Sequence, residues 1–185
     1  MNLNRDLIAP EIEFLPKGIY ETSGGYICQL VPYKDARVDM DILDDEVGFN
    51  CWQNEYRRDS NGVLQCGIGV FFEDIKRGEW VWKWSNGTPS EYEKVKGEYS
   101  DAFKRAGFMW GIGRCLYNFP RIGVYMVEGE YEFLNDKIKA TRKFKPNDWK
   151  WEFAEAYQKI VAKQKFGNRW KERYNSEPYK KIETK

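Results

Sequence analysis

A long helical pattern that follows three short strand patterns is the strongest constraint on the fold of this chain. The helix is predicted to run from Ser90 to about Leu116, and Ser90 with the acidic residue three positions later forms a capping box. Phe103, Ala106 and Trp110 recur at helical spacing on one side. We expect this side to pack against the strands, because a helix within a protein gains most of its stability from such packing.

The predicted helix ends in a Gly-Ile-Gly-Arg segment, from Gly111 to Arg114. These glycines follow the helix instead of preceding it, and the chain has no GxxxxGK[ST] motif. We therefore interpret them as a device that ends the helix, and we do not expect nucleotide hydrolysis.

Three strand patterns precede the helix and predict an antiparallel meander. An Asn-Gly turn joins the first strand to the second, and a Lys-Arg-Gly turn joins the second to the third. The three predicted strands are Cys51–Arg57, Val63–Ile75 and Glu79–Ser85.

The third strand carries Trp80, Trp82 and Trp84 on one face and Lys83 on the other. Such a tryptophan ladder can stack nucleic-acid bases, or it can form the buried face of a sheet. Because an apolar-faced helix follows directly, we predict that the ladder packs against the helix and that Lys83 faces solvent.

The segments before the meander predict a helix with clear ends. Asp35 is a plausible N-cap, Val47 the last helical residue and Gly48 a natural stop. The first 25 residues are expected to form mainly loops, and a short strand is expected at Tyr26–Val31.

Beyond Pro120 the patterns are weaker. They predict a strand at 123–127, a second strand near 130–134, a basic linker at 137–146 and an amphipathic helix over 148–165. The fold class predicted from all of these patterns is α+β, with an antiparallel meander of three or more strands packed on a long helix. We expect one domain over residues 1–136, and a C-terminal basic linker, helix and tail over residues 137–185.

Composition excludes several kinds of chemistry. The 185 residues include no histidine, which excludes Ser-His-Asp and Cys-His catalysis and histidine-ligated zinc. The four cysteines are far apart and form no CxxC motif, so we expect reduced, mostly buried thiols and no cofactor. No apolar run approaches the length of about 18 residues that a membrane-spanning helix needs, and the N-terminus has no apolar signal region. We expect a cytoplasmic protein.

Charge is distributed unevenly along the chain. Residues 137–185 contain 15 Lys/Arg and 6 Asp/Glu, whereas the whole chain has 30 and 29. The body is therefore acidic and the tail basic. A basic tail favours an acidic partner, such as nucleic acid or a neighbouring subunit.

Two groups of charged residues are candidates for function. Six acidic residues lie in or beside the first predicted helix, and converging carboxylates could hold the metal ions of a nuclease. On one helix these carboxylates spread around the cylinder, so a solvated face is the simpler interpretation. The six are Asp35, Asp39, Asp41, Asp44, Asp45 and Glu46.

Lys104 and Arg105 form the second group, in the middle of the long helix. With Arg114 near the helix end, they could reach phosphates if the helix borders a groove. Taken alone, the pattern is also typical of a solvated helix face.

Two segments together resemble the Rad52-type single-strand annealing proteins, and the phage-encoded branch most. The first is Tyr33-Lys34-Asp35-Ala36-Arg37 with Leu43–Gly48 and Trp52; the second is Ser100–Ala106 with Trp110–Arg114 and Leu116-Tyr117. The resemblance covers about Leu15 to Pro120. Helix, three-stranded meander and long helix also follow one another in the family order.

The resemblance implies ATP-independent annealing of complementary single strands in recombination and repair. It implies a homo-oligomeric ring or helical filament, with DNA in a basic groove between the helix-bearing body and the β-hairpin, and no bond chemistry. The implied DNA-binding residues are Arg37, Lys76, Arg77, Lys83, Lys104, Arg105 and Arg114. Phe108 departs from the pattern, since some members carry a further basic residue there.

Other readings stay open beside this one. The same fold could protect single-stranded DNA ends without annealing them. A metal-dependent nuclease would use Asp35, Asp39 and Asp41. A purely structural subunit is a fourth possibility, and the basic tail is open to DNA, a neighbouring subunit or a host single-strand-binding protein as its partner.

Overall fold

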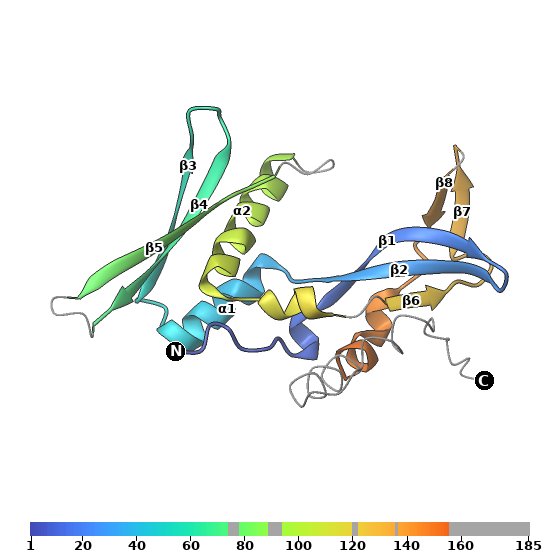
Figure 1. The fold of residues 1–185 in the computed structure, drawn as a ribbon, viewed down its shortest axis with the longest axis horizontal. Coiled ribbons are helices and arrows are strands. Elements are labelled where there is room, and N and C mark those ends of the chain that lie inside the picture. The colour runs from blue at the N-terminus through green and yellow to red at the C-terminus, as the bar shows by residue number, and fades with distance from the viewer. Residues whose placement is uncertain (74–77, 89–93, 120–121, 136, 156–185) are drawn as a thin grey trace. The chain divides into compact units, whose positions relative to one another are not determined.

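The structure, a computed structural model, describes residues 1–73, 78–88, 94–119, 122–135 and 137–155 (Figure 1). The chain forms an α+β fold with antiparallel sheets and divides into two compact units. Unit 1 comprises Met1–Leu7 and Lys34–Cys115, and unit 2 comprises Ile8–Tyr33 with the chain from Leu116 onward. This division differs from the boundary at residue 136 expected from the sequence, because the strands of unit 2 come from the chain before residue 34 and after residue 115.

Unit 1 is built on the predicted meander. Strands β3 (Trp52–Arg58), β4 (Leu64–Phe72) and β5 (Glu79–Asn86) pair antiparallel in that order. Asp59 shapes the turn between β3 and β4, since its Oδ1 accepts hydrogen bonds from the backbone N–H groups of Asn61 and Val63, both at 2.9 Å. The Asn-Gly signal in the sequence therefore marked the turn correctly.

Helix α2 (Lys94–Trp110) packs on this sheet, as predicted. Phe103 and Ala106 are fully buried, and the Trp110 indole N–H donates to the Ile68 backbone oxygen at 2.9 Å. The helix ends earlier than expected because Gly111 has a φ of 107°, and a 3-10 helix (Arg114–Asn118) follows. The predicted capping box at Ser90 lies outside the described residues.

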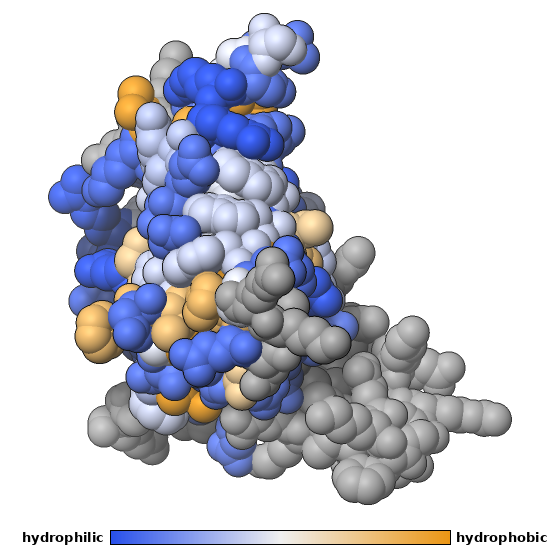
Figure 2. All heavy atoms as spheres, turned by 90° about the vertical axis from the view of Figure 1, so that its left-hand side faces the viewer, coloured by the Kyte–Doolittle hydropathy of each residue, from blue (hydrophilic) through white to orange (hydrophobic). Residues whose placement is uncertain are grey.

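The tryptophan ladder does not pack against α2, so that prediction was wrong. The register pairs Trp84 with Gly67 and Trp82 with Gly69, on the face of the sheet opposite to the one that carries Ile68. Strand β4 decides which face is buried: Leu64, Cys66, Ile68 and Val70 alternate toward α2 and leave glycines on the other side. Figure 2 looks onto that outer face, where a pale band of intermediate hydropathy lies between bluer margins.

Helix α1 (Ala36–Val47) follows the sequence prediction closely. Asp35 is its N-cap, and its side chain accepts a hydrogen bond from the Arg37 backbone N–H at 2.9 Å. Gly48 ends the helix with a φ of 99°, and its N–H bonds to the carbonyls of Leu43 and Asp44.

Unit 2 contains a strand that the sequence prediction missed. Strands β1 (Glu13–Thr22), β2 (Gly25–Tyr33) and β6 (Ile122–Tyr125) form an antiparallel sheet in that order, after a 3-10 turn at Ala9–Glu11. The loop prediction for residues 1–25 relied on Pro10, Pro16 and the Gly24-Gly25 pair. Because β1 is an edge strand with a register shift between Pro16 and Gly18, it accommodates the proline.

The rest of unit 2 forms a second small sheet and a short helical segment. Strands β7 (Tyr131–Leu134) and β8 (Lys137–Ala140) pair antiparallel, so β8 replaces the start of the predicted linker. A 3-10 helix (Pro146–Trp149) leads into helical residues 150–155; the remainder of the helix predicted to reach 165 is outside the described residues. Phe14 and Phe153 meet edge-to-face in the core, with ring centroids 4.9 Å apart.

The four cysteines are free thiols, and Cys28, Cys66 and Cys115 are buried, as predicted. Burial raises the pKa of the Cys28 thiol to about 11. In the part of the chain that the structure describes, no helix is both long and apolar enough to cross a membrane.

Candidate nucleic-acid interface

A buried ion pair lies at the start of α1, where the end of the α2 segment packs against it. The Lys34 ammonium binds both carboxylate oxygens of Asp39, and the two side chains are only 5% and 0% exposed. The predicted solvated acidic face is therefore wrong for Asp39. Burying two charges is costly unless they are paired with good geometry, so each residue needs the other.

Two glycines of the α2 segment make room for this pair. A Cβ atom at Gly107 would lie 3.0 Å from Asp39 Oδ1, and one at Gly113 would overlap Lys34 Cε. Gly113 also has a φ of 76°, a conformation that favours glycine. The Lys34–Asp39 pair thus sits where α1 approaches the end of α2, and larger side chains at either glycine would displace it.

Burial dominates the acid–base behaviour of the pair. It raises the pKa of the Asp39 carboxyl to about 6, although Lys34 acts in the opposite direction. It also lowers the pKa of the Lys34 ammonium, against the attraction of Asp39. Both shifts favour the neutral forms, so desolvation costs this pair more than the mutual attraction returns.

Arg37 and Lys104 lie around one carboxylate beside the pair. The Arg37 guanidinium contacts Asp35 at 3.0 Å and is 83% exposed. Hydrogen bonds from Arg37 hold the pKa of Asp35 below its usual range, and the positive charge of Lys104 adds to this effect. Lys104 is half-buried, and its positive charge also offsets part of the rise that burial causes in the pKa of Asp39. The positive charges of Arg37 and Lys104 therefore both act on Asp35.

Arg105 is adjacent to Lys104 in sequence but has a different environment. Its Nε contacts Asp101 at 2.8 Å, one helical turn earlier, and the side chain is 55% exposed. Asp101 also accepts the Thr88 backbone N–H at 2.9 Å, which anchors the chain that follows β5. Arg105 is therefore accessible to a ligand while pairing with a surface carboxylate.

Lys83 and Arg114 meet at the C-terminal end of α2. Lys83 Nζ lies 4.2 Å from the centroid of the Trp110 ring and donates to the Met109 carbonyl at 3.2 Å. Arg114 donates to the carbonyls of Met109 and Phe108 at 3.1 and 2.9 Å. Cations here satisfy helix-end carbonyls and the helix dipole, a structural role that the sequence did not indicate.

The position of Lys83 differs from the one expected for the hairpin side of the DNA groove. Lys83 lies on the α2 side of the sheet, so the prediction that it faces solvent across from α2 is wrong. Lys76 and Arg77 lie outside the described residues. Of the seven cations proposed from sequence, Arg37 with Lys104 and Lys83 with Arg114 form two local groups, and Arg105 stands on its own.

The Lys34–Asp39 pair was not predicted from the sequence, although a signal for it was present. Lys34 directly precedes the N-cap Asp35, and Asp39 is the fourth residue after it. These two positions are the ones that a hydrophobic staple joins at a helix start. Here a charged pair occupies the staple positions, and opposite charges at that spacing would have predicted the contact.

Two of the three carboxylates considered for a nuclease pair with cations. Asp39 is bound to Lys34 and Asp35 to Arg37, while Asp41 is exposed. Among the described residues, no three His, Cys, Asp or Glu side chains gather into a group that could hold a metal ion.

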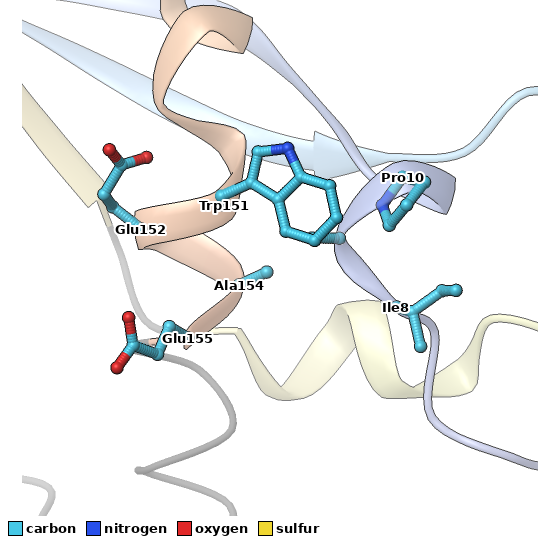
Figure 3. Close-up of a pocket in the computed structure, with 7 residues that line it drawn as sticks. Ile8, Pro10, Trp151, Glu152, Ala154 and Glu155 are labelled. Carbon is cyan, nitrogen blue, oxygen red and sulfur yellow. The ribbon is translucent and has the colours of Figure 1, made fainter.

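Unit 2 contains a pocket of about 600 Å³. Trp151 and Ala154 line it from the helical segment, opposite Ile8 and Pro10, and Glu152 and Glu155 stand on the helix side (Figure 3). Its described lining carries no lysine or arginine, so it does not resemble a phosphate-binding site.

No model of a known protein family matches the sequence, and no curated protein matches it either.

Proposed function

We propose that this chain is a Rad52-like annealing protein that binds single-stranded DNA and pairs complementary strands without ATP. The fold proposed for unit 1 is the Rad52-like arrangement of helix, meander and long helix. In this proposal the protein acts as a homo-oligomer in the host cytoplasm, in recombination or repair of a phage or prophage.

The observation that carries the proposal is the meeting of the two resembling segments. They lie far apart in the sequence, yet Lys34 of the first packs against Gly113 of the second, and Asp39 packs against Gly107 beside this contact. The family resemblance rests on those segments. Their contact supports a shared structural role, and the charges of Arg37 and Lys104 both act on the Asp35 carboxylate beside it.

The physical mechanism requires positioning and no bond chemistry. Lys104 supplies a positive charge, and the Arg37 guanidinium can exchange the Asp35 carboxylate for a phosphate with the same fork geometry. Neutralising phosphates releases counterions and gives affinity without sequence preference. A backbone held in this way leaves base edges open to a second strand, and base pairing selects the product.

The test measures binding and annealing of labelled complementary oligonucleotides at several salt concentrations, without ATP. Wild type should anneal them, and Lys104→Ala with Arg37→Ala should bind more weakly. Each lost phosphate contact should reduce the slope of log K against log salt by about 0.7. The single variant Lys104→Ala should reduce the slope as well. Lys17→Ala, the same loss of one positive charge on the exposed part of β1, is its matched control and should leave the slope unchanged.

Three outcomes separate the readings. A wild-type protein that does not bind single strands would overturn the proposal. A protein that binds and protects ends but does not anneal would favour the end-protection alternative. Equal slopes for Lys104→Ala and Lys17→Ala would reject the assigned residues.

A further inference from the structure

The outer face of the β3–β4–β5 sheet carries a continuous row of aromatic rings. Trp80, Trp82 and Trp84 alternate along β5, with ring centroids 6.4 and 5.8 Å apart and interplanar angles of 34° and 24°. Phe71 of β4 extends the row at 5.4 Å from Trp80. We call these four residues the aromatic row.

Glycines on β4 give the rings their positions. A Cβ atom at Gly67 would lie 2.6 Å from Trp84 Cε2, and one at Gly69 would lie 2.8 Å from Trp82 Cε2. Each indole therefore occupies the space that a side chain on the opposite strand would fill. Rings held against backbone in this way lose little entropy when a ligand binds.

The indole N–H groups distinguish this face from the α2 face. On the α2 side, Trp52 donates to Asp44 at 2.7 Å and Trp110 donates to the Ile68 carbonyl at 2.9 Å. Within the described chain, the indoles of the aromatic row donate to no protein acceptor. Three donors beside exposed ring surface suit a ligand that combines flat rings with oxygen or nitrogen acceptors.

The charge on this face is balanced. Arg57 Cζ lies 3.7 Å from the centroid of the Trp84 ring, and Glu55 stands two residues earlier on the same face of β3. A guanidinium over an indole is a frequent component of single-strand binding surfaces. With Glu55 nearby, the face offers stacking and little net phosphate attraction.

We propose that the aromatic row is a base-stacking platform that binds unpaired bases of single-stranded nucleic acid. The ring spacing supports single strands over duplex, because neighbouring bases in a duplex strand are only about 3.4 Å apart. An extended strand can place one base on each ring at the observed spacing of 5.8 to 6.4 Å. The proposal rests on the proposed function. It adds a surface that binds bases, whereas Arg37 and Lys104 are proposed to bind phosphates.

The test compares binding of an oligo-dT strand with an abasic strand of equal length and charge. Wild type should prefer the strand with bases. Trp82→Ala should lose about tenfold in affinity for oligo-dT, since stacking contributes about 1–3 kcal/mol per base. It should bind the abasic strand like wild type and keep the wild-type salt slope, whereas Lys104→Ala should keep the base preference and change the slope.

Further variants control for folding and for tryptophan loss in general. Trp82→Phe keeps a ring and should retain most of the binding. Trp151→Ala removes an exposed tryptophan of unit 2 and should bind like wild type. If circular dichroism shows that Trp82→Ala is misfolded, Trp80→Ala replaces it, because Trp80 is 36% exposed and the most accessible indole of the row.

Several results would contradict the proposed base-stacking platform. Equal binding of oligo-dT by wild type and the folded Trp82→Ala or Trp80→Ala variant would do so, and the annealing function would stand if Lys104→Ala still lost affinity. A smaller assembly of the Trp82→Ala protein in native mass spectrometry, with unchanged base preference, would assign this face to a second copy of the chain. Failure of wild type to bind any strand would remove the proposed function as well.

Discussion

Two ion pairs of unit 1 have similar chemistry and opposite surroundings. Lys34 and Asp39 are almost fully buried between α1 and two glycines of the α2 segment. Arg105 and Asp101 lie one turn apart on α2, with side chains 55% and 31% exposed. The buried pair determines how two segments meet, whereas the exposed pair leaves a cation within reach of a ligand. Between these two pairs, burial and not the presence of charge decides whether the cation is available for binding.

The largest effect is expected from breaking the buried pair. Asp39→Ala leaves the Lys34 ammonium unpaired in the core and should lower the free energy of unfolding by about 3–5 kcal/mol. The double variant Lys34→Met with Asp39→Leu removes both charges and should be near wild type or more stable, by up to about 4 kcal/mol. Urea denaturation of the two variants measures this difference.

One result would contradict this prediction. If the double variant were as unstable as Asp39→Ala, the pair would contribute more by its specific geometry than its burial costs. The claim that desolvation dominates the pKa shifts of Lys34 and Asp39 would then be wrong.

A smaller effect is expected at Gly113. Gly113→Ala forces an alanine into a φ of 76° and brings its Cβ onto Lys34 Cε, so we expect a loss of about 2–3 kcal/mol. Gly62→Ala is the matched control, because Gly62 has a φ of 78° and no atom within 4 Å of an added Cβ. The difference between the two losses isolates the contact with Lys34, and equal losses would show that the contact contributes nothing.

The smallest effect on stability is expected at the exposed pair. Arg105→Gln removes the cation and leaves Asp101 bonded to Thr88, so unfolding should change by no more than about 0.5 kcal/mol. The same variant should weaken single-strand binding at low salt if Arg105 contacts a phosphate. Thermal unfolding and a salt titration of binding separate the two roles, and a loss of stability above 1 kcal/mol would place Arg105 with the structural cations.

Local patterns predicted the elements of unit 1 well. The N-cap Asp35, the stop at Gly48 and the turn at Asp59 each act within a few residues, and a sequence shows such interactions directly. The packing of Phe103 and Ala106 against the sheet also followed from helical spacing. The Lys34–Asp39 contact had a readable signal at the helix start, in the staple positions.

The orientation of the sheet could not be read from β5 alone. Alternation shows that Trp82 and Lys83 face opposite sides, but it does not show which side is buried. Strand β4 holds that information, since its branched and apolar residues alternate with Gly67 and Gly69. Strand β1 was missed for a related reason: Pro16 disfavours a central strand, and only the pairing with β2 shows that β1 is an edge.

The order of the strands in unit 2 has a consequence for synthesis of the chain. Strands β1 and β2 are neighbours in sequence and can pair as soon as both have left the ribosome, but β6 follows only after the whole of residues 34–115. Domains generally fold as units while the chain emerges. Unit 1 therefore completes its contacts first, and during this time the free edge of β2 has no partner. An unpaired edge is open to wrong strands, so nascent chains are most at risk of mispairing between the completion of unit 1 and the arrival of Ile122–Tyr125.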